Sequence, residues 1–100
     1  MEAAQSLARL ALQHEGSLDD QIQYAFKRCT LRTATPKELT ALVALFKDSR
    51  EQLAAEPNEA MSLATEPLGK LPDGIDTTDA AAMTVVANVL LNLDEMFLKR

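Results

Sequence analysis

The sequence predicts an all-α fold: a small helical bundle of four main helices, with a long loop before a central, hydrophobic C-terminal helix. Apolar residues recur at the spacing of a helix face in four segments, and helix-start signals precede three of them. The 100 residues hold only three glycines and four prolines, too few for a turn-rich β sandwich. A chain of this length buries about 60–65% of its unfolded surface, so residues 1–100 are expected to form a single all-helical domain around one modest core.

A glycine separates the first two predicted helices. Gly16 ends the first helix, and the second begins at Ser17, whose hydroxyl can accept a first-turn N–H. Asp19 and Asp20 suit the positive end of that helix dipole, and the helix should run to about Leu31. The apolar face of the first helix holds Ala3, Ala4, Leu7, Leu10 and Ala11, and that of the second holds Leu18, Ile22, Ala25, Phe26 and Cys29.

The third helix has the strongest start signal in the chain. Thr35 stands at the N-cap, Pro36 at the first helical position, and Glu38 where its carboxylate can bind the cap backbone. Pro57 limits this helix to about Ala55. Its core-facing residues are predicted to be Leu39, Leu42, Val43, Phe46 and Leu53.

A long connection, residues 56–76, follows, within which residues 58–64 favour one or two further helical turns. Two prolines and two glycines in residues 66–76 predict a loop. Its apolar residues, expected to attach it to the body, are Leu68, Leu71 and Ile75.

The last helix is predicted from Thr78 to about Phe97, with Asp76 or Thr77 as its cap. Eleven of the fourteen residues in 80–93 are apolar, so the helix is hydrophobic nearly all round. Such a helix belongs in the middle of a fold. This apolar stretch is shorter than the roughly 20 residues that cross a bilayer, so no membrane insertion is expected.

Composition and motifs exclude several kinds of site. The net charge of −5 argues against nucleic acid as a partner, and one cysteine excludes a disulfide or a cysteine-based metal site within one chain. The chain lacks haem-attachment, zinc-protease, EF-hand, nucleophile-elbow and glycine-rich phosphate motifs. His14 is interpreted as a helix-end residue and Cys29 as a small core residue. We therefore predict no catalytic, cofactor-binding or metal-binding residue, and no enzyme activity of this chain.

Charges are unevenly distributed. Residues 51–79 hold seven acidic residues and a single base, Lys70, which indicates either an acidic face for a basic partner or cation, or solvated loops and helix ends. A small basic cluster around the second turn, without interleaved aromatic residues, favours a solvated helix end over phosphate binding. Its members are Lys27, Arg28, Arg32 and Lys37.

A candidate polar stripe lies on the last helix. Thr84, Asn88 and Asn92 repeat every four residues, and Glu95 follows near the next turn. The stripe is interpreted first as a solvent-facing strip, second as buried amides that tie the helix to a neighbour, and third as an amide–carboxylate site.

Residues Ala80–Glu95 resemble the C-terminal signature of large planctomycete and verrucomicrobial cytochrome-c-like secreted proteins, whose final domain has an unknown function. Residues 22–28 and 35–39 resemble segments of the same domain in the same order, so the resemblance covers about 18–98. Met83 stands where that family usually has tryptophan, but it still fills core volume.

The resemblance implies a C-terminal fragment of a larger exported protein, located in the periplasm or at the cell surface, with the upstream domains as partners. The family's haem attachment lies upstream of this domain, so the resemblance implies no cofactor in this chain.

The expected function is a non-catalytic structural or interaction module of such a protein. One alternative is an accessory domain that contributes Asn88, Asn92 and Glu95 to an enzyme site formed mainly by upstream domains; another is a free-standing acidic helical adaptor. Leu45 and Leu98 lie outside the main apolar stripes and are the candidate interface of a homodimer, over which a monomer is slightly favoured.

Overall fold

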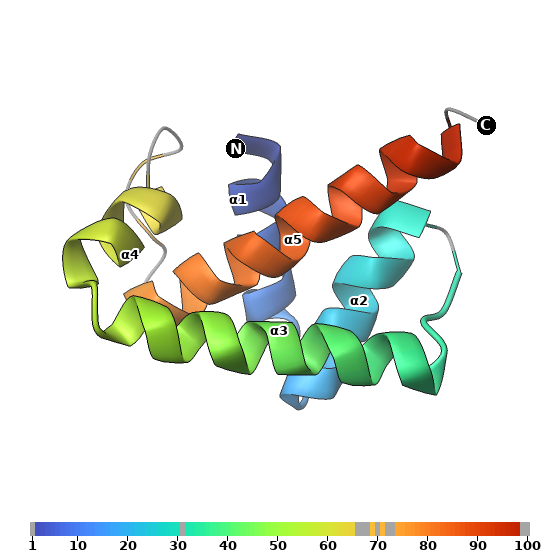
Figure 1. Ribbon diagram of the computed structural model, residues 1–100, viewed down its shortest axis with the longest axis horizontal. Helices are drawn as coiled ribbons and strands as arrows, with labels where there is room; N and C mark the ends of the chain where they lie inside the picture. Colours follow the sequence, from blue (N-terminus) through green and yellow to red (C-terminus); the bar gives the residue numbers. More distant parts are fainter. Residues whose placement is uncertain (1, 31, 66–68, 70, 72–73, 99–100) are drawn as a thin grey trace.

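The computed structural model describes residues 2–30, 32–65, 69, 71 and 74–98, and only the backbone of residues 2 and 93–98. Its helices are α1 (Glu2–Gln13), α2 (Leu18–Thr30), α3 (Pro36–Ala54), α4 (Pro57–Thr65) and α5 (Thr77–Leu98), and these described residues include no strand. The all-α prediction is confirmed. In Figure 1, α1 runs downward from the N-terminus, α2 returns upward beside it, and α3 crosses below them toward α4.

The predicted starts of α2 and α3 are confirmed in atomic detail. The Thr35 hydroxyl accepts from the backbone N–H of Glu38 at 3.2 Å, and the Glu38 carboxylate accepts from the backbone N–H of Thr35 at 2.9 Å. The same reciprocal pair joins Ser17 and Asp20 at 3.3 and 3.1 Å, with aspartate in the place of glutamate.

The predicted long connection is shorter than expected, because α4 occupies its first half. Pro57 begins α4 at a position where its missing N–H costs no helix bond. Residues 58–64, where the sequence favours one or two turns, all lie within this nine-residue helix. Beyond it, Leu71 and Ile75 pack against the core as predicted, whereas Leu68 lies outside the described residues.

Two polar residues of α1 hold α4 in place, and we call them the Gln5–Arg9 clamp. The Gln5 side-chain amide is fully buried and donates to the backbone carbonyl of Leu63 at 2.6 Å. One turn further along α1, the Arg9 guanidinium donates to the carbonyls of Ala64, at 3.2 Å, and Gly69. These carbonyls belong to the C-terminal end of α4 and the loop beyond it, where the helix leaves acceptors unpaired.

The predicted central position of α5 is confirmed. Asp76 caps it by accepting from the backbone N–H of Asp79 at 3.1 Å, and α5 then contacts all four other helices, α1 most extensively. Five consecutive residues, Ala80–Thr84, are buried, as are Val86, Ala87 and Leu90. Met83 is fully buried in this core. Among the described residues, no helix combines the length and apolarity that a membrane crossing requires.

The remaining apolar stripes follow the prediction, except at Ala3 and Leu10 of α1, which are exposed. Ile22, Phe26 and Phe46 are buried in the core, and Cys29 lies half-buried against it. Leu10, predicted to face the core, is 40% exposed. The buried face of α1 is instead formed by Ala4, Gln5, Leu7, Ala8 and Ala11.

Candidate functional site

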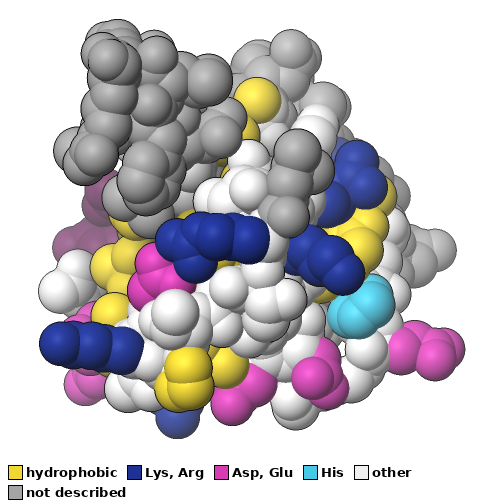
Figure 2. All heavy atoms as spheres, turned by 90° about the vertical axis from the view of Figure 1, so that its right-hand side faces the viewer, with side chains coloured by type: hydrophobic (Ala, Val, Ile, Leu, Met, Phe, Trp, Pro, Cys, Tyr) yellow, Lys and Arg dark blue, Asp and Glu magenta, His cyan; other side chains and the backbone are white. Residues whose placement is uncertain are grey.

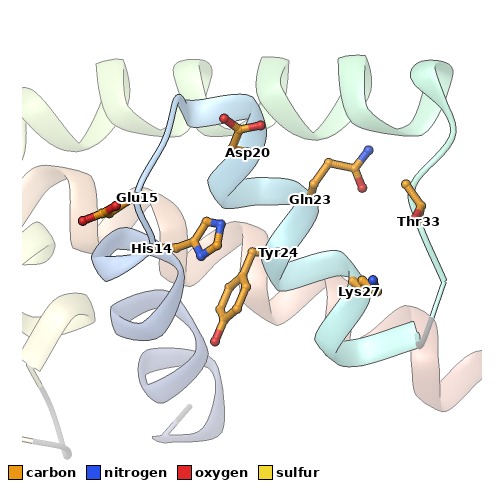
Figure 3. A pocket seen from close by; sticks show the side chains of 7 residues that line it. All are labelled: His14, Glu15, Asp20, Gln23, Tyr24, Lys27 and Thr33. Atoms are coloured by element: carbon orange, nitrogen blue, oxygen red, sulfur yellow. The ribbon is translucent and has the colours of Figure 1, made fainter.

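A surface groove lies along the exposed side of α2, and we call it the α2 groove. It encloses about 540 Å³ and is open to solvent along its length. Four lining side chains come from α2 itself and three from the connections on either side of it (Figure 3). They are Asp20, Gln23, Tyr24 and Lys27 from α2, His14 and Glu15 from the α1–α2 connection, and Thr33 from the α2–α3 connection.

The helix periodicity of α2 explains why these side chains share a face. Positions 20, 23, 24 and 27 follow one line of the helix, while Ile22, Ala25 and Phe26 face the core. Gly16 lets the α1–α2 connection approach this line closely: its φ is +125°, and a Cβ there would lie 2.6 Å from a carboxylate oxygen of Asp20.

A stacked pair of rings forms the middle of the groove. The His14 and Tyr24 rings have centroids 4.5 Å apart and an interplanar angle of 15°. The Gln21 amide donates to the carbonyls of Leu12 and His14, each at 3.3 Å, and so fixes the backbone that carries the histidine. The Arg28 guanidinium carbon lies 5.9 Å from the Tyr24 centroid. The pair is an aromatic surface with a cation beside it.

Gln23 fixes the wall formed by the α2–α3 connection, which lies opposite the wall formed by the α1–α2 connection. Its amide donates to the carbonyl of Ala34 at 3.1 Å and accepts from the backbone N–H of Ala34 at 2.9 Å. This two-bond contact ties the α2–α3 connection, which carries Thr33, to the helix. Both walls of the groove are therefore held by glutamine amides that bind backbone, an arrangement that preorganises a surface for binding.

The charges of the groove are separated along its length. Asp20 lies near the start of α2 and Lys27 toward its other end, with Tyr24 between them, whereas the Glu15 side chain points away from Tyr24 (Figure 3). On the corresponding face of the molecule, several lysine and arginine side chains lie near the centre with the single histidine beside them, and acidic side chains lie next to this group, at the left and along the lower edge (Figure 2).

The predicted basic cluster has aromatic neighbours that the sequence did not suggest. Besides the contact of Arg28 with Tyr24, the Arg32 guanidinium lies 4.8 Å from the Phe26 centroid and pairs with Glu38 at 2.8 Å. Hydrogen bonds from Arg32 and from the Thr35 backbone lower the pKa of Glu38 from 4.5 to about 2. This network braces the connection beside the groove, so Arg32 has a structural role.

The candidate polar stripe of α5 is divided by the fold. Thr84 is buried, and its hydroxyl donates to the Ala80 carbonyl at 2.7 Å, so the interpretation of Thr84 as solvent-facing is wrong. Asn88 and Asn92 are exposed, and the Glu95 side chain lies outside the described residues. The stripe changes from buried to exposed because the core surrounds α5 on all sides at Ala80–Thr84, whereas at Asn88 and Asn92 this side of the helix faces solvent. None of its described members lines the α2 groove.

The candidate dimer interface is only partly visible. Leu45 is half-buried against the core, and the side chain of Leu98 lies outside the described residues. The exposed apolar residue Leu10 instead lines a separate groove of about 370 Å³ between α1, α2 and α5, together with Cys29 and Leu91.

The acidic segment contributes to a third groove, of about 360 Å³. Its lining includes the acidic residues Glu56 and Glu59 and the apolar residues Leu53, Leu63 and Val85. Across the described part of the chain, no three histidine, cysteine, aspartate or glutamate side chains are grouped so that they could hold a metal ion.

Sequence reasoning missed the ring pair. His14 was interpreted as a helix-end residue, and it does follow the last residue of α1, but its ring stacks on Tyr24. One signal was available in the sequence. Gly16 allows the chain to reverse between α1 and α2, so a residue just before this reversal is expected to lie beside the second turn of α2.

Comparison of the chain with protein-family models, with curated proteins and with solved structures found no match.

Proposed function

We propose that this chain is a non-catalytic interaction module that binds a polypeptide segment of a partner domain in the α2 groove. The observation that carries the proposal is the stacked His14–Tyr24 pair, in which an exposed histidine ring lies on a half-buried tyrosine between two walls that Gln21 and Gln23 hold in place. Tyrosine and arginine side chains are enriched in protein interfaces, and tyrosine offers a large contact area at low entropic cost. Arg28 beside Tyr24 completes such a surface.

The polar groups of the groove support binding better than bond-making chemistry. Gln23 uses both amide atoms on the Ala34 backbone, Asp20 accepts from the Ser17 N–H, and the His14 ring is stacked rather than directed at a nucleophile. The groove is open, whereas catalytic sites gain from excluding water. An open aromatic surface with fixed walls is suited to an extended chain.

The proposal extends to the setting of the module. We place it at the C-terminal end of a large exported cytochrome-c-like protein of the planctomycete type, where an upstream domain supplies the bound segment. This part is supported by the resemblance of residues 18–98 alone.

One observation favours a second candidate function, an accessory domain for an enzyme site formed by other domains. Asn88 and Asn92 are exposed one turn apart on α5, so both amides can reach a neighbouring domain. This face is separate from the α2 groove, and substitutions at Tyr24 and Asn88 therefore distinguish the two candidates.

The test is selection of displayed random peptides on the purified chain. Selected peptides should bind the wild type at least tenfold more tightly than Tyr24→Ala or His14→Ala, with Asn88→Ala unchanged as the matched surface control. Circular dichroism checks that each variant is folded, and His14→Ala removes an exposed side chain at little risk to the core. No enrichment, or enrichment that survives both groove substitutions, would overturn the proposal. Enrichment lost in Asn88→Ala alone would favour the α5 face.

A further inference from the structure

The charge pattern of the α2 groove points to its ligand, and this step rests on the proposed function. We infer that the groove binds a short extended segment in which a cationic and an acidic residue stand three positions apart, with apolar residues or proline between them.

The two ends of the groove carry opposite charge. Glu15 and Asp20 line one end, and the exposed Asp19 lies next to them on α2. One Asp20 oxygen accepts from the Ser17 N–H, but a carboxylate has about four acceptor positions and retains the others for a ligand. Lys27 lines the other end, with Arg28 beside it. A ligand of one charge sign would be attracted at one end and repelled at the other.

The helix sets the distance between the charges. Asp20 and Lys27 are seven residues apart on α2, and at 1.5 Å per residue this corresponds to about 10 Å along the helix axis. An extended chain rises about 3.3 Å per residue, so a ligand covers the same distance in three residues. A cation at one ligand position and an acid three positions later therefore match both ends at once.

The middle of the groove selects the intervening residues. Tyr24 and His14 present an aromatic surface, on which proline or an aliphatic side chain packs without needing hydrogen bonds. Proline also restricts the free ligand to an extended form, which lowers the entropy lost on binding. Thr33, exposed at the wall, supplies a hydroxyl within the groove for the ligand backbone.

The same pattern disfavours a polyanion. A nucleic-acid backbone attracted to Lys27 and Arg28 would bring further phosphates toward Glu15 and Asp20. The ligand chemistry is therefore that of a dipolar peptide.

The test uses three fluorescein-labelled peptides that share the framework Gly-X-Pro-Leu-Z-Gly, with X and Z as Lys and Glu, Lys and Lys, or Glu and Glu. Fluorescence polarisation at low salt should show the Lys/Glu peptide binding at least fivefold more tightly than either single-sign peptide. Lys27→Glu places a carboxylate beside Arg28 at the basic end, so it should abolish the advantage of the Lys/Glu peptide over the Lys/Lys peptide. Lys47→Glu, an equal charge change at an exposed α3 position outside the groove, should leave the wild-type order intact.

The outcomes separate this inference from the proposed function. One outcome is that the displayed peptides require Tyr24 for binding while the three probes bind equally or a single-sign probe binds best. In that case the inferred charge pattern is wrong, and the proposed function as an interaction module is retained. If Lys27→Glu and Lys47→Glu change the order alike, net charge rather than the groove selects the ligand, and the inference is overturned. If no peptide depends on Tyr24, both fail.

Discussion

Replacing Gln5 with alanine should destabilise the fold by about 3 kcal/mol, which is large for one polar residue. The Gln5 amide is fully buried and donates to the Leu63 carbonyl at 2.6 Å. Leaving a buried acceptor without its donor costs about 1–3 kcal/mol. Removing the Cγ methylene of the side chain from the core adds about 0.8 kcal/mol. For a domain of this size, the sum lowers the melting temperature by about 15 °C or more.

The assay is urea unfolding followed by circular dichroism, with two companion variants. Gln5→Met keeps the side-chain volume but removes the donor, so it should lose only the hydrogen-bond part, about 1–3 kcal/mol. Gln13→Ala, at an exposed position of the same helix, should stay within about 0.5 kcal/mol of the wild type. A wild-type stability for Gln5→Met would refute the reasoning, because it would mean that the bond to Leu63 does not support α4.

Three further predictions follow from the local structure. The pKa of Glu38 is lowered from 4.5 to about 2, so its ionised form stabilises the fold above pH 4.5, and the contribution is lost as the pH falls toward 2. Urea midpoints of wild type and Glu38→Gln should therefore converge over this range, and a constant difference would contradict the assignment. Gly16→Ala should destabilise more than Gly74→Ala, because both glycines have positive φ but only at Gly16 would a Cβ meet Asp20; equal losses in urea unfolding would exclude the contact. Sedimentation over a hundredfold concentration range should give a constant monomer mass of 10.9 kDa; a rising mass that Leu45→Glu abolishes would instead identify a dimer.

The sequence predicts the helix starts well because each depends on residues within one turn. Thr35 with Glu38, Ser17 with Asp20, and Asp76 all cap as expected. The central place of α5 was also predictable, since a helix that is apolar on all sides can bury itself only in the middle. The helix starts and the central position of α5 both depend on residues that are close together in the sequence.

Features that join distant segments were not predictable from these patterns. Gln5 and Arg9 look like polar interruptions of an apolar helix face, and their role appears only when α4, more than fifty residues later, brings its carbonyls to them. Thr84 looked like part of an exposed polar line with Asn88. It lies where the core surrounds α5, and its hydroxyl tolerates burial because it bonds the carbonyl four residues earlier.

In the α2 groove, some features could be predicted from the sequence and others could not. The line of α2 that carries Tyr24 and Lys27 follows from helix periodicity, so its exposed face could be predicted. The stacking of His14 on Tyr24 depends on how tightly the chain turns at Gly16, which periodicity does not specify. The separation of charge along the groove could be recognised only when the structure showed that the two connections lie on either side of α2.

The position of α5 also determines when the chain can fold. Of the helices in the described residues it is the last to be synthesised, yet it provides the surface on which α1, α3 and α4 pack. Until Thr77 and the residues after it leave the ribosome, the earlier helices have no common core, and their apolar faces remain accessible to chaperones and to aggregation. The contacts of α1 with α5 close nearly the whole chain into one loop, so folding should be slower than in helical bundles built from sequential neighbours.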